Sequence, residues 1–256
     1  MNRYKCTISY DGTQFSGYQI QPNKRTVQSE FERVLQGMHK GEHVKIVASG
    51  RTDATVHATG QVVHFDSYLL IPVDKWKRAL NSMLPDDIRV RTVELAKPDF
   101  HARFDVKAKE YRYRLLISND PCVFKRHYTH YYPYPLNLSA MREAAKYLLG
   151  THDFTSFCAS NTEVQDKVRT IYDIAIDRHN DELVISFVGN GFLYNMVRIL
   201  VGTLLEVGNG QKEPVSIKSI LSGKDRTLAG KTAPGYGLYL SQVFYEEWKK
   251  EESKKM

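Results

Sequence analysis

The sequence has no long hydrophobic run and no apolar segment at its start. Nowhere in its 256 residues does an uninterrupted apolar stretch approach the roughly 20 residues that a membrane-spanning helix needs. The first residues, Met1–Tyr10, are polar and strand-like and do not resemble a signal region. These absences argue against a membrane protein and predict a protein of the cytoplasm.

Cysteine is also scarce. Cys6, Cys122 and Cys158 are far apart, odd in number, and lie in no ligand spacing with histidine. Without a C-x-x-C pair, the chain offers neither a disulfide framework nor a zinc site, and buried thiols are the favoured interpretation. The chain also lacks a G-x-G-x-x-G pattern between a strand and a helix, which argues against a bound dinucleotide.

The balance of charge is basic. Thirty-six Lys and Arg against 29 Asp and Glu give a formal net charge of +7. In residues 246–256 the four lysines and four glutamates cancel, so the excess belongs to the rest of the chain. A basic body favours a polyanionic partner such as nucleic acid, although charge alone does not identify one.

The hydrophobic pattern of the first hundred residues alternates between strand and helix periods. Apolar residues at helical spacing after Val27, and again after Pro72, predict two amphipathic helices. Runs with strand character lie at residues 3–10, 44–48, 61–65 and 88–92. The order β-α-β-β-α-β is that of a ferredoxin-like half.

The remainder repeats this scheme loosely. It predicts a strand at 110–117, a helix at 141–149 that stops at Gly150, a hairpin around Asn180-Asp181, a helix at 193–205 and a strand at 239–245. We therefore expect an α+β protein of two ferredoxin-like halves, with helices on one side of the sheet. The expected division is 1–100, 105–246 and a charged tail, 247–256.

Gly50-Arg51-Thr52-Asp53 lies between two expected strands, in a loop that a rigid scaffold could present for function. Gly, Thr and Asp are equally the residues of an ordinary tight turn, which spacing alone favours. Arg198 lies at the edge of the apolar stripe of its helix, where it could face a cleft or extend into solvent. Both questions stay open at this point.

Three stretches interleave aromatic and basic residues. Such stretches suit base stacking beside phosphate contacts, but they also fit strands with an aromatic core face and a solvated basic face. They comprise His101, Arg103 and Phe104, then Tyr111 to Arg114, then His127 to Tyr132. His57, His64 and His152 form no metal-ligand grouping and are expected to be structural or surface residues.

Five segments in order resemble the TruA-type tRNA pseudouridine synthases. The first is Tyr10-Asp11-Gly12-Thr13 through Gly17-Tyr18-Gln19 with Thr26-Val27-Gln28, and the second is Gly50-Arg51-Thr52-Asp53 through Val56-His57-Ala58 with Gln61 to Phe65. The others are Phe100 to Phe104 with Tyr111-Arg112-Tyr113, then Gly191-Phe192 through Met196-Val197-Arg198 to Gly202, then Ala233-Pro234 with Gly237 to Leu240.

The resemblance implies isomerisation of uridine to pseudouridine in the anticodon stem-loop of tRNA, at positions 38, 39 or 40. It implies base flipping without a cofactor or a metal, and a homodimer that works on tRNA. It also implies two ferredoxin-like halves whose sheets join across a central basic cleft that holds the catalytic aspartate.

By the same resemblance, Asp53 is the catalytic aspartate and Arg198 is the arginine that pairs with it. Tyr111 matches the tyrosine that stacks on the target base, and Leu238 matches an apolar residue beside that base. Arg51 is a second candidate to keep the aspartate charged, or to grip the RNA backbone. The remaining candidates for substrate binding are Arg103 and His101.

The chain departs from the family pattern at two positions. The family usually has Gly where this chain has Thr55, which would be strained if that site needs a positive φ. It usually has Trp where Tyr18 stands. The alternative function is therefore a non-catalytic or weakly active RNA-binding protein or tRNA chaperone. A nucleotide-dependent RNA enzyme is disfavoured by the missing phosphate-cradling motif.

Overall fold

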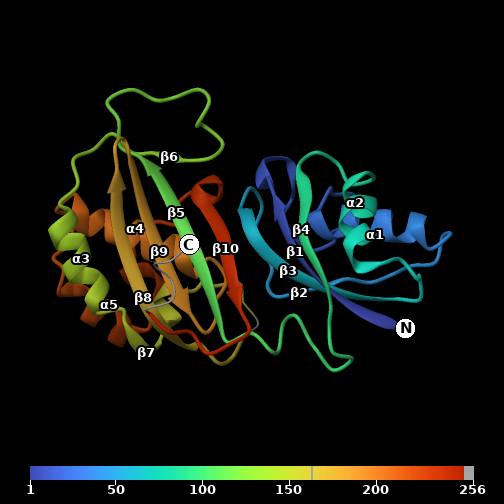
Figure 1. Ribbon diagram of the computed structural model, residues 1–256. Helices are drawn as coiled ribbons and strands as arrows, with labels where there is room; N and C mark the ends of the chain where they lie inside the picture. The colour runs from blue at the N-terminus through green and yellow to red at the C-terminus, as the bar shows by residue number, and fades with distance from the viewer. Residues whose placement is uncertain (163, 251–256) are drawn as a thin grey trace. The chain divides into compact units, whose positions relative to one another are not determined.

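The computed structural model describes residues 1–162 and 164–250 (Figure 1). The chain forms two compact units. The first comprises Met1–Lys107 and Tyr239–Glu246, and the second comprises Ala108–Leu238 and the described part of 247–256. Both units are mixtures of helices and mostly antiparallel strands, which confirms the expected α+β class. The division expected from the sequence, into residues 1–100, 105–246 and 247–256, stays a prediction.

The first unit is built on a sheet in which β4, β1 and β3 lie side by side in that order. Both β2 and β10 also pair with β3, the former antiparallel at Val47↔His64 and the latter parallel at Tyr239↔His57. The order β4-β1-β3-β2 is the ferredoxin-like one that the sequence predicts. The elements are β1 (Asn2–Tyr10), α1 (Val27–Met38), β2 (Val47–Ala48), β3 (His57–Ser67), α2 (Val73–Asn81), β4 (Ile88–Leu95) and β10 (Leu238–Phe244).

An aromatic cluster forms the core of the first unit. Tyr4 and Phe65 are opposite each other in the β1–β3 register, so their rings share one face of the sheet. Trp76 of α2 packs against both rings, with centroids 4.9 and 5.4 Å away. Phe31 of α1 reaches Phe65 at 6.4 Å. The two helices therefore cover the same face of this sheet (Figure 1).

The second unit has the strand order β5-β9-β8-β7, with antiparallel neighbours, and β6 pairs in parallel with β5. The β8–β9 hairpin turns at Asn180, whose φ of 53° is left-handed, as the Asn-Asp turn predicts. Its elements are β5 (Ala108–Leu116), β6 (His130–Tyr131), α3 (Leu138–Lys146), β7 (Gly150–Asp153), β8 (Val168–His179), β9 (Glu182–Gly189), α4 (Met196–Gly208) and α5 (Ser216–Gly223).

The expected end of the helix before Gly150 is wrong. Helix α3 ends at Lys146, and Gly150, with φ +94°, instead opens β7. Gly150 pairs with Ile171 of β8, so its backbone groups belong to the sheet and the helix ends three residues earlier than expected. Within the described residues, no helix is long and apolar enough to cross a membrane.

Candidate active site

The loop between β2 and β3, residues 49–56, is held at its start by one buried side chain. Gln61 of β3 accepts a hydrogen bond from the Ser49 hydroxyl at 2.7 Å and donates one to the Gly50 carbonyl at 2.8 Å. The Ser49 N–H also donates to Val62 at 2.8 Å. Because the Gln61 amide oxygen and the amide nitrogen each make a hydrogen bond to the loop, the backbone at Ser49 and Gly50 is held in one position.

The middle of the loop is held at Thr52. Its hydroxyl lies 2.7 Å from that of Tyr10, in the interior of the unit. Its carbonyl accepts the N–H of Tyr18 at 3.0 Å. Gly17 makes this approach possible: it has φ +95°, and a Cβ there would lie 3.0 Å from the Thr52 oxygen. The loop backbone therefore rests directly on residues 17 and 18.

Asp53 follows Thr52 and is half-buried, while Arg51 before it is exposed. The Asp53 carbonyl accepts the N–H of Val56 at 3.2 Å, which closes a tight turn. The two sequence interpretations of this segment are thus compatible. The turn is real, and it carries Asp53.

Thr55 has the positive φ that its family position suggested, at +65°. A left-handed conformation costs a non-glycine residue roughly 1–2 kcal/mol, and β-branched residues adopt it least readily. The Thr55 N–H lies 3.4 Å from the Phe15 carbonyl, so the strained residue is also tied to the neighbouring loop. The turn that carries Asp53 therefore stores backbone strain.

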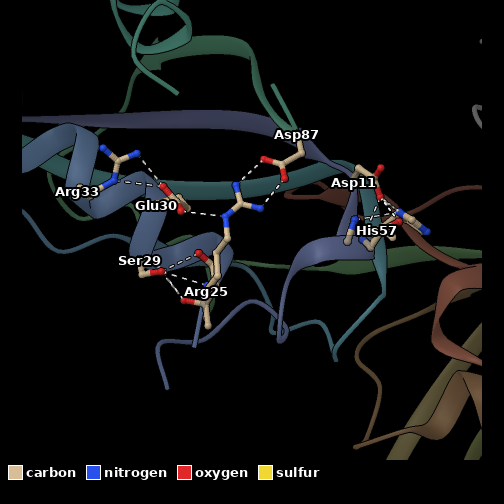
Figure 2. Close-up of polar contacts among 10 residues, drawn as sticks. Asp11, Arg25, Ser29, Glu30, Arg33, His57 and Asp87 are labelled. Carbon is tan, nitrogen blue, oxygen red and sulfur yellow. Dashed lines mark hydrogen bonds and ion pairs between the residues drawn. The ribbon is translucent and has the colours of Figure 1, made fainter. Parts of the chain in front are cut away.

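His57, the first residue of β3, connects this loop with residues 11–26, here called the brace loop. The Gly12 N–H donates to His57 Nδ1 at 3.0 Å, and an Asp11 carboxylate oxygen lies 3.2 Å from the same nitrogen (Figure 2). The ring is buried and stacks on Tyr239 at 4.7 Å. His57 is structural, as expected.

Arg25 anchors the far end of the brace loop (Figure 2). Its guanidinium donates to both oxygens of Asp87, at 2.6 and 2.9 Å, and to Glu30 at 3.0 Å. It also lies over the Phe15 ring at 4.2 Å. Hydrogen bonding to Asp87 raises the pKa of Arg25 above its ordinary value. Since the Asp11 N–H donates to the Asp87 carbonyl, both ends of the brace loop meet at this aspartate.

His101 and Arg103 lie together in a second loop of the first unit. The His101 Nδ1 accepts the backbone N–H groups of Arg103 and Phe104, at 3.1 and 3.2 Å. The Arg103 and Phe104 side chains are exposed, whereas Ala102, which precedes them, is buried. Both predicted RNA-binding residues therefore lie on one turn, and its basic member is accessible.

In the second unit, Arg198 is a half-buried residue of α4 that is tied to the segment before β10. Its Nε donates to the Ala233 carbonyl at 2.7 Å, and one terminal nitrogen donates to the Asn195 side chain at 2.8 Å. The Ala233 N–H returns a bond to the Arg198 carbonyl at 3.1 Å. Arg198 is therefore no solvent-extended arginine. Leu238, five residues after Ala233, is buried.

Tyr111 and Tyr113 are both buried on β5, so this stretch has the aromatic core face that we considered. Tyr111 packs edge-on against Phe192 at 5.2 Å. The Tyr113 hydroxyl donates to the Pro234 carbonyl at 2.9 Å, which holds the same segment that Arg198 contacts. Between the tyrosines, Arg112 pairs with a neighbouring carboxylate on its own strand.

The predicted site residues are thus divided between the units. Arg51, Asp53, His101 and Arg103 belong to the first unit, and Tyr111, Arg198 and Leu238 belong to the second. The sequence interpretation missed how Gln61 and Tyr10 support the loop. A glutamine beside two valines in a buried strand is a signal that could have identified Gln61.

The chain is similar to known proteins over nearly its whole length. A family model described as tRNA pseudouridine synthase matches residues 7–105 and 144–246. A tRNA pseudouridine synthase A of a Geobacillus species is 59% identical over 244 residues, which cover 95% of this chain and 98% of that protein. A tRNA pseudouridine synthase A 1 of Bacillus cereus is 58% identical, covering 96% and 99%. The tRNA pseudouridine synthase A of Bacillus subtilis is 57% identical, covering 95% and 99%.

Proposed function

Because the chain belongs to the tRNA pseudouridine synthase family, we propose that it isomerises uridine in the anticodon stem-loop of tRNA, at position 38, 39 or 40. Family membership makes the protein an isomerase that modifies tRNA. The position in tRNA and the mechanism are our proposal. A homodimer and a cytoplasmic location stay predictions from the resemblance.

The observation that favours this mechanism is the set of contacts that hold the Asp53 loop in place. Gln61, Tyr10 and the backbone of residues 17 and 18 all hold the loop backbone around this aspartate. A site that must place one group accurately against a substrate is expected to be held this way, since small displacements cost rate. Ordinary RNA binding would gain nothing from a carboxylate on a loop supported in this way, because RNA is a polyanion.

In the proposed reaction, the target uridine is flipped out of the RNA, at a cost of a few kcal/mol. The bond between N1 and C1′ breaks, the uracil rotates, and a bond forms between C5 and C1′. The C5 proton is lost and N1 gains a proton, so nothing is oxidised or hydrolysed overall. Asp53 acts in its ionised form, as a nucleophile or as a base.

The roles of the other residues in this proposal follow from the resemblance. A guanidinium favours the charged form of a carboxylate, and we assign that role to Arg198. Tyr111 stacks on the target base and assists removal of the C5 proton, and Leu238 packs against the base. The residues proposed to hold the RNA are Arg51, Arg103 and His101.

The alternative is a non-catalytic or weakly active RNA-binding protein. The observation in its favour is the strained φ of +65° at Thr55, two residues after Asp53. We favour the enzyme because Asp53, Tyr111, Arg198 and Leu238 occur together.

The experiment is pseudouridine formation in unmodified tRNA anticodon arms, comparing wild type with Asp53→Asn. Asp74→Asn, at an exposed position of α2, is the matched control. If the protein is the proposed enzyme, wild type and the control should form pseudouridine and Asp53→Asn should form none. All three proteins should bind the RNA. Arms in which cytidine replaces uridine at 38, 39 or 40 assign the position. Tight binding without product from wild type would establish the alternative.

A further inference from the structure

Phe104 is an exposed aromatic ring that is nevertheless fixed in place. Its side chain is 74% exposed. The ring stacks on His101, with centroids 4.2 Å apart and planes inclined by 25°. The Arg103 guanidinium lies 5.7 Å from the Phe104 centroid. An aromatic ring, an imidazole and a guanidinium are thus gathered on one turn, residues 100–105.

The backbone of this turn is held by side chains from β3, from β1 and from just after β10. The Ala102 N–H donates to Nδ1 of His64 on β3 at 3.0 Å, and its carbonyl accepts the Tyr245 hydroxyl, just after β10, at 2.8 Å. Arg3 of β1 donates to the Phe100 carbonyl at 2.9 Å. The turn is therefore part of the scaffold of the first unit and differs from a freely moving surface loop.

The side chain beneath Phe104 is fixed as well. The His101 Nδ1 accepts two backbone N–H groups of the turn, and the backbone N–H of His101 donates to an Asp105 carboxylate oxygen at 2.8 Å. The His101 ring also contacts His64 edge-on at 5.0 Å. Because the supporting ring cannot rotate freely, Phe104 presents its exposed surface in a fixed orientation.

We propose that Phe104 is a stacking platform for an unpaired nucleobase of the RNA substrate, and that Arg103 contacts a phosphate beside that base. This inference rests on the proposed function for the identity of the RNA. Single exposed apolar residues are common on protein surfaces. This ring differs because it is immobilised and has a cation beside it, which is the composition of base-stacking sites in proteins that bind single-stranded nucleic acid.

RNA is favoured over a protein partner by what surrounds the ring. The exposed neighbours in the chain, Arg103 and Asp105, are charged, and no further large apolar side chain of the turn is exposed. A protein contact would need a wider apolar patch. An aromatic face with one adjacent cation instead suits a base and its phosphate.

The test measures affinity for the anticodon arm at several salt concentrations. Phe104→Ala should weaken binding roughly tenfold without changing the salt slope, and Phe104→Trp should restore affinity. Arg103→Ala should reduce the salt slope by about one phosphate contact. The matched control is Tyr68→Ala, which removes a ring that is 44% exposed in the first unit and whose chain neighbours, Ser67 and Leu69, carry no charge; this variant should bind as wild type does.

Fluorescence of 2-aminopurine at each unpaired position of the arm adds a direct readout. One position should be quenched by wild type and by Phe104→Trp, but not by Phe104→Ala. Equal affinity and equal quenching in Phe104→Ala and wild type would overturn the platform. The platform would also be overturned if Phe104→Ala changed the oligomeric state of the protein but kept the quenching, because Phe104 would then form a protein contact.

The same variants separate the platform from the proposed function. If wild type forms pseudouridine and Phe104→Ala binds unchanged, the platform fails and the function stands. If wild type forms no product but Phe104→Ala loses affinity and quenching, the platform stands and the function fails. Thermal unfolding of Phe104→Ala should match wild type because the ring is exposed, so lost affinity would not reflect lost folding.

Discussion

The hydroxyl of Tyr10, the last residue of β1, lies 2.7 Å from the hydroxyl of Thr52, which immediately precedes Asp53. Burial raises the pKa of Tyr10 to about 12, so the phenol keeps its proton at neutral pH. The support of the proposed catalytic loop thus includes a neutral hydrogen bond between residues 42 positions apart.

Removing that hydroxyl should loosen the loop. Tyr10→Phe leaves the Thr52 hydroxyl without this partner in a buried place, so the free energy of unfolding should fall by about 1 kcal/mol. Pseudouridine formation should fall more than stability explains, because Asp53 is less well positioned. Chemical denaturation and turnover on a tRNA arm measure the two effects. Unchanged turnover at lower stability would contradict the positioning role.

Tyr18→Phe is the matched substitution with the opposite expectation. Among the described residues, the buried Tyr18 hydroxyl has no hydrogen-bond partner. Removing an unsatisfied buried hydroxyl should leave the free energy of unfolding unchanged or raise it by about 1 kcal/mol. Denaturation under the same conditions checks this, and a clear loss of stability would show that the hydroxyl has a favourable role.

Gly17→Ala tests the close approach of the brace loop to the backbone around Asp53. A Cβ would stand 3.0 Å from the Thr52 oxygen and 3.3 Å from the Ala54 nitrogen. Gly41 has a similar φ, +97°, but nothing within 4 Å of its Cβ position. Both substitutions should cost about 1 kcal/mol of stability. Only Gly17→Ala should also lower turnover, by about tenfold or more, and equal turnover in both variants would refute the contact's importance.

Thr55→Gly should relieve strain in the turn that carries Asp53. We expect the free energy of unfolding to rise by roughly 0.5–1 kcal/mol, since glycine's freedom in the unfolded chain offsets part of the gain. Asn23→Gly, at φ 56°, is the control, because asparagine tolerates this conformation and should gain less. Turnover of Thr55→Gly should equal or exceed that of wild type. A loss of turnover would mean that the threonine contributes to activity.

Stability should depend on pH through His64. Burial, together with the charges of Arg3 and His101, lowers the pKa of His64 to about 4, against raising effects of Asp66 and Asp105. Near pH 6.5 and below, the unfolded chain binds a proton that the folded chain does not. The stabilising contribution is therefore complete above pH 6.5 and declines as pH falls toward 4.

Urea unfolding at pH 7 and pH 5 measures this dependence. His64→Gln keeps a hydrogen-bond acceptor for the Ala102 N–H but removes the titrating group, so its stability should change less between the two pH values. His179→Gln, at the exposed end of β8, should keep the wild-type dependence. Identical slopes in all three proteins would show that His64 is not responsible.

The sequence was sufficient for the elements whose signals are local. The stripe after Val27 and the alternation of Ile88 and Val90 with arginines correspond to α1 and β4. The helix before Gly150 was predicted to end three residues too late, because Gly150 instead pairs with β8, which lies about twenty residues further along the chain. Local propensity contains no information about such a partner.

In the candidate site, too, some features have a local signal in the sequence and others depend on residues that are distant in the sequence. The loop between two strands could be predicted from local patterns, whereas the strain at Thr55 was expected only from the resemblance, because the family usually has glycine there. Arg25 with Asp87, and Tyr10 with Thr52, are contacts between residues 62 and 42 positions apart. Only the assembled sheet brings such pairs together, so no spacing in the sequence could have indicated them.

The first unit is completed only by β10, a strand that lies near the end of the chain. Residues 239–246, which include all of β10 except Leu238, belong with residues 1–107, and Tyr239 of this strand stacks on His57 beside the Asp53 loop. During translation, residues 108–238 must be synthesised before this strand exists, which takes on the order of ten seconds at bacterial elongation rates. A nascent first unit therefore lacks the ring that packs on His57. A ribosome-bound chain that stops before β10 should thus lack the Tyr239 contact beside the proposed catalytic loop, and we expect it to modify RNA only after that strand has been made.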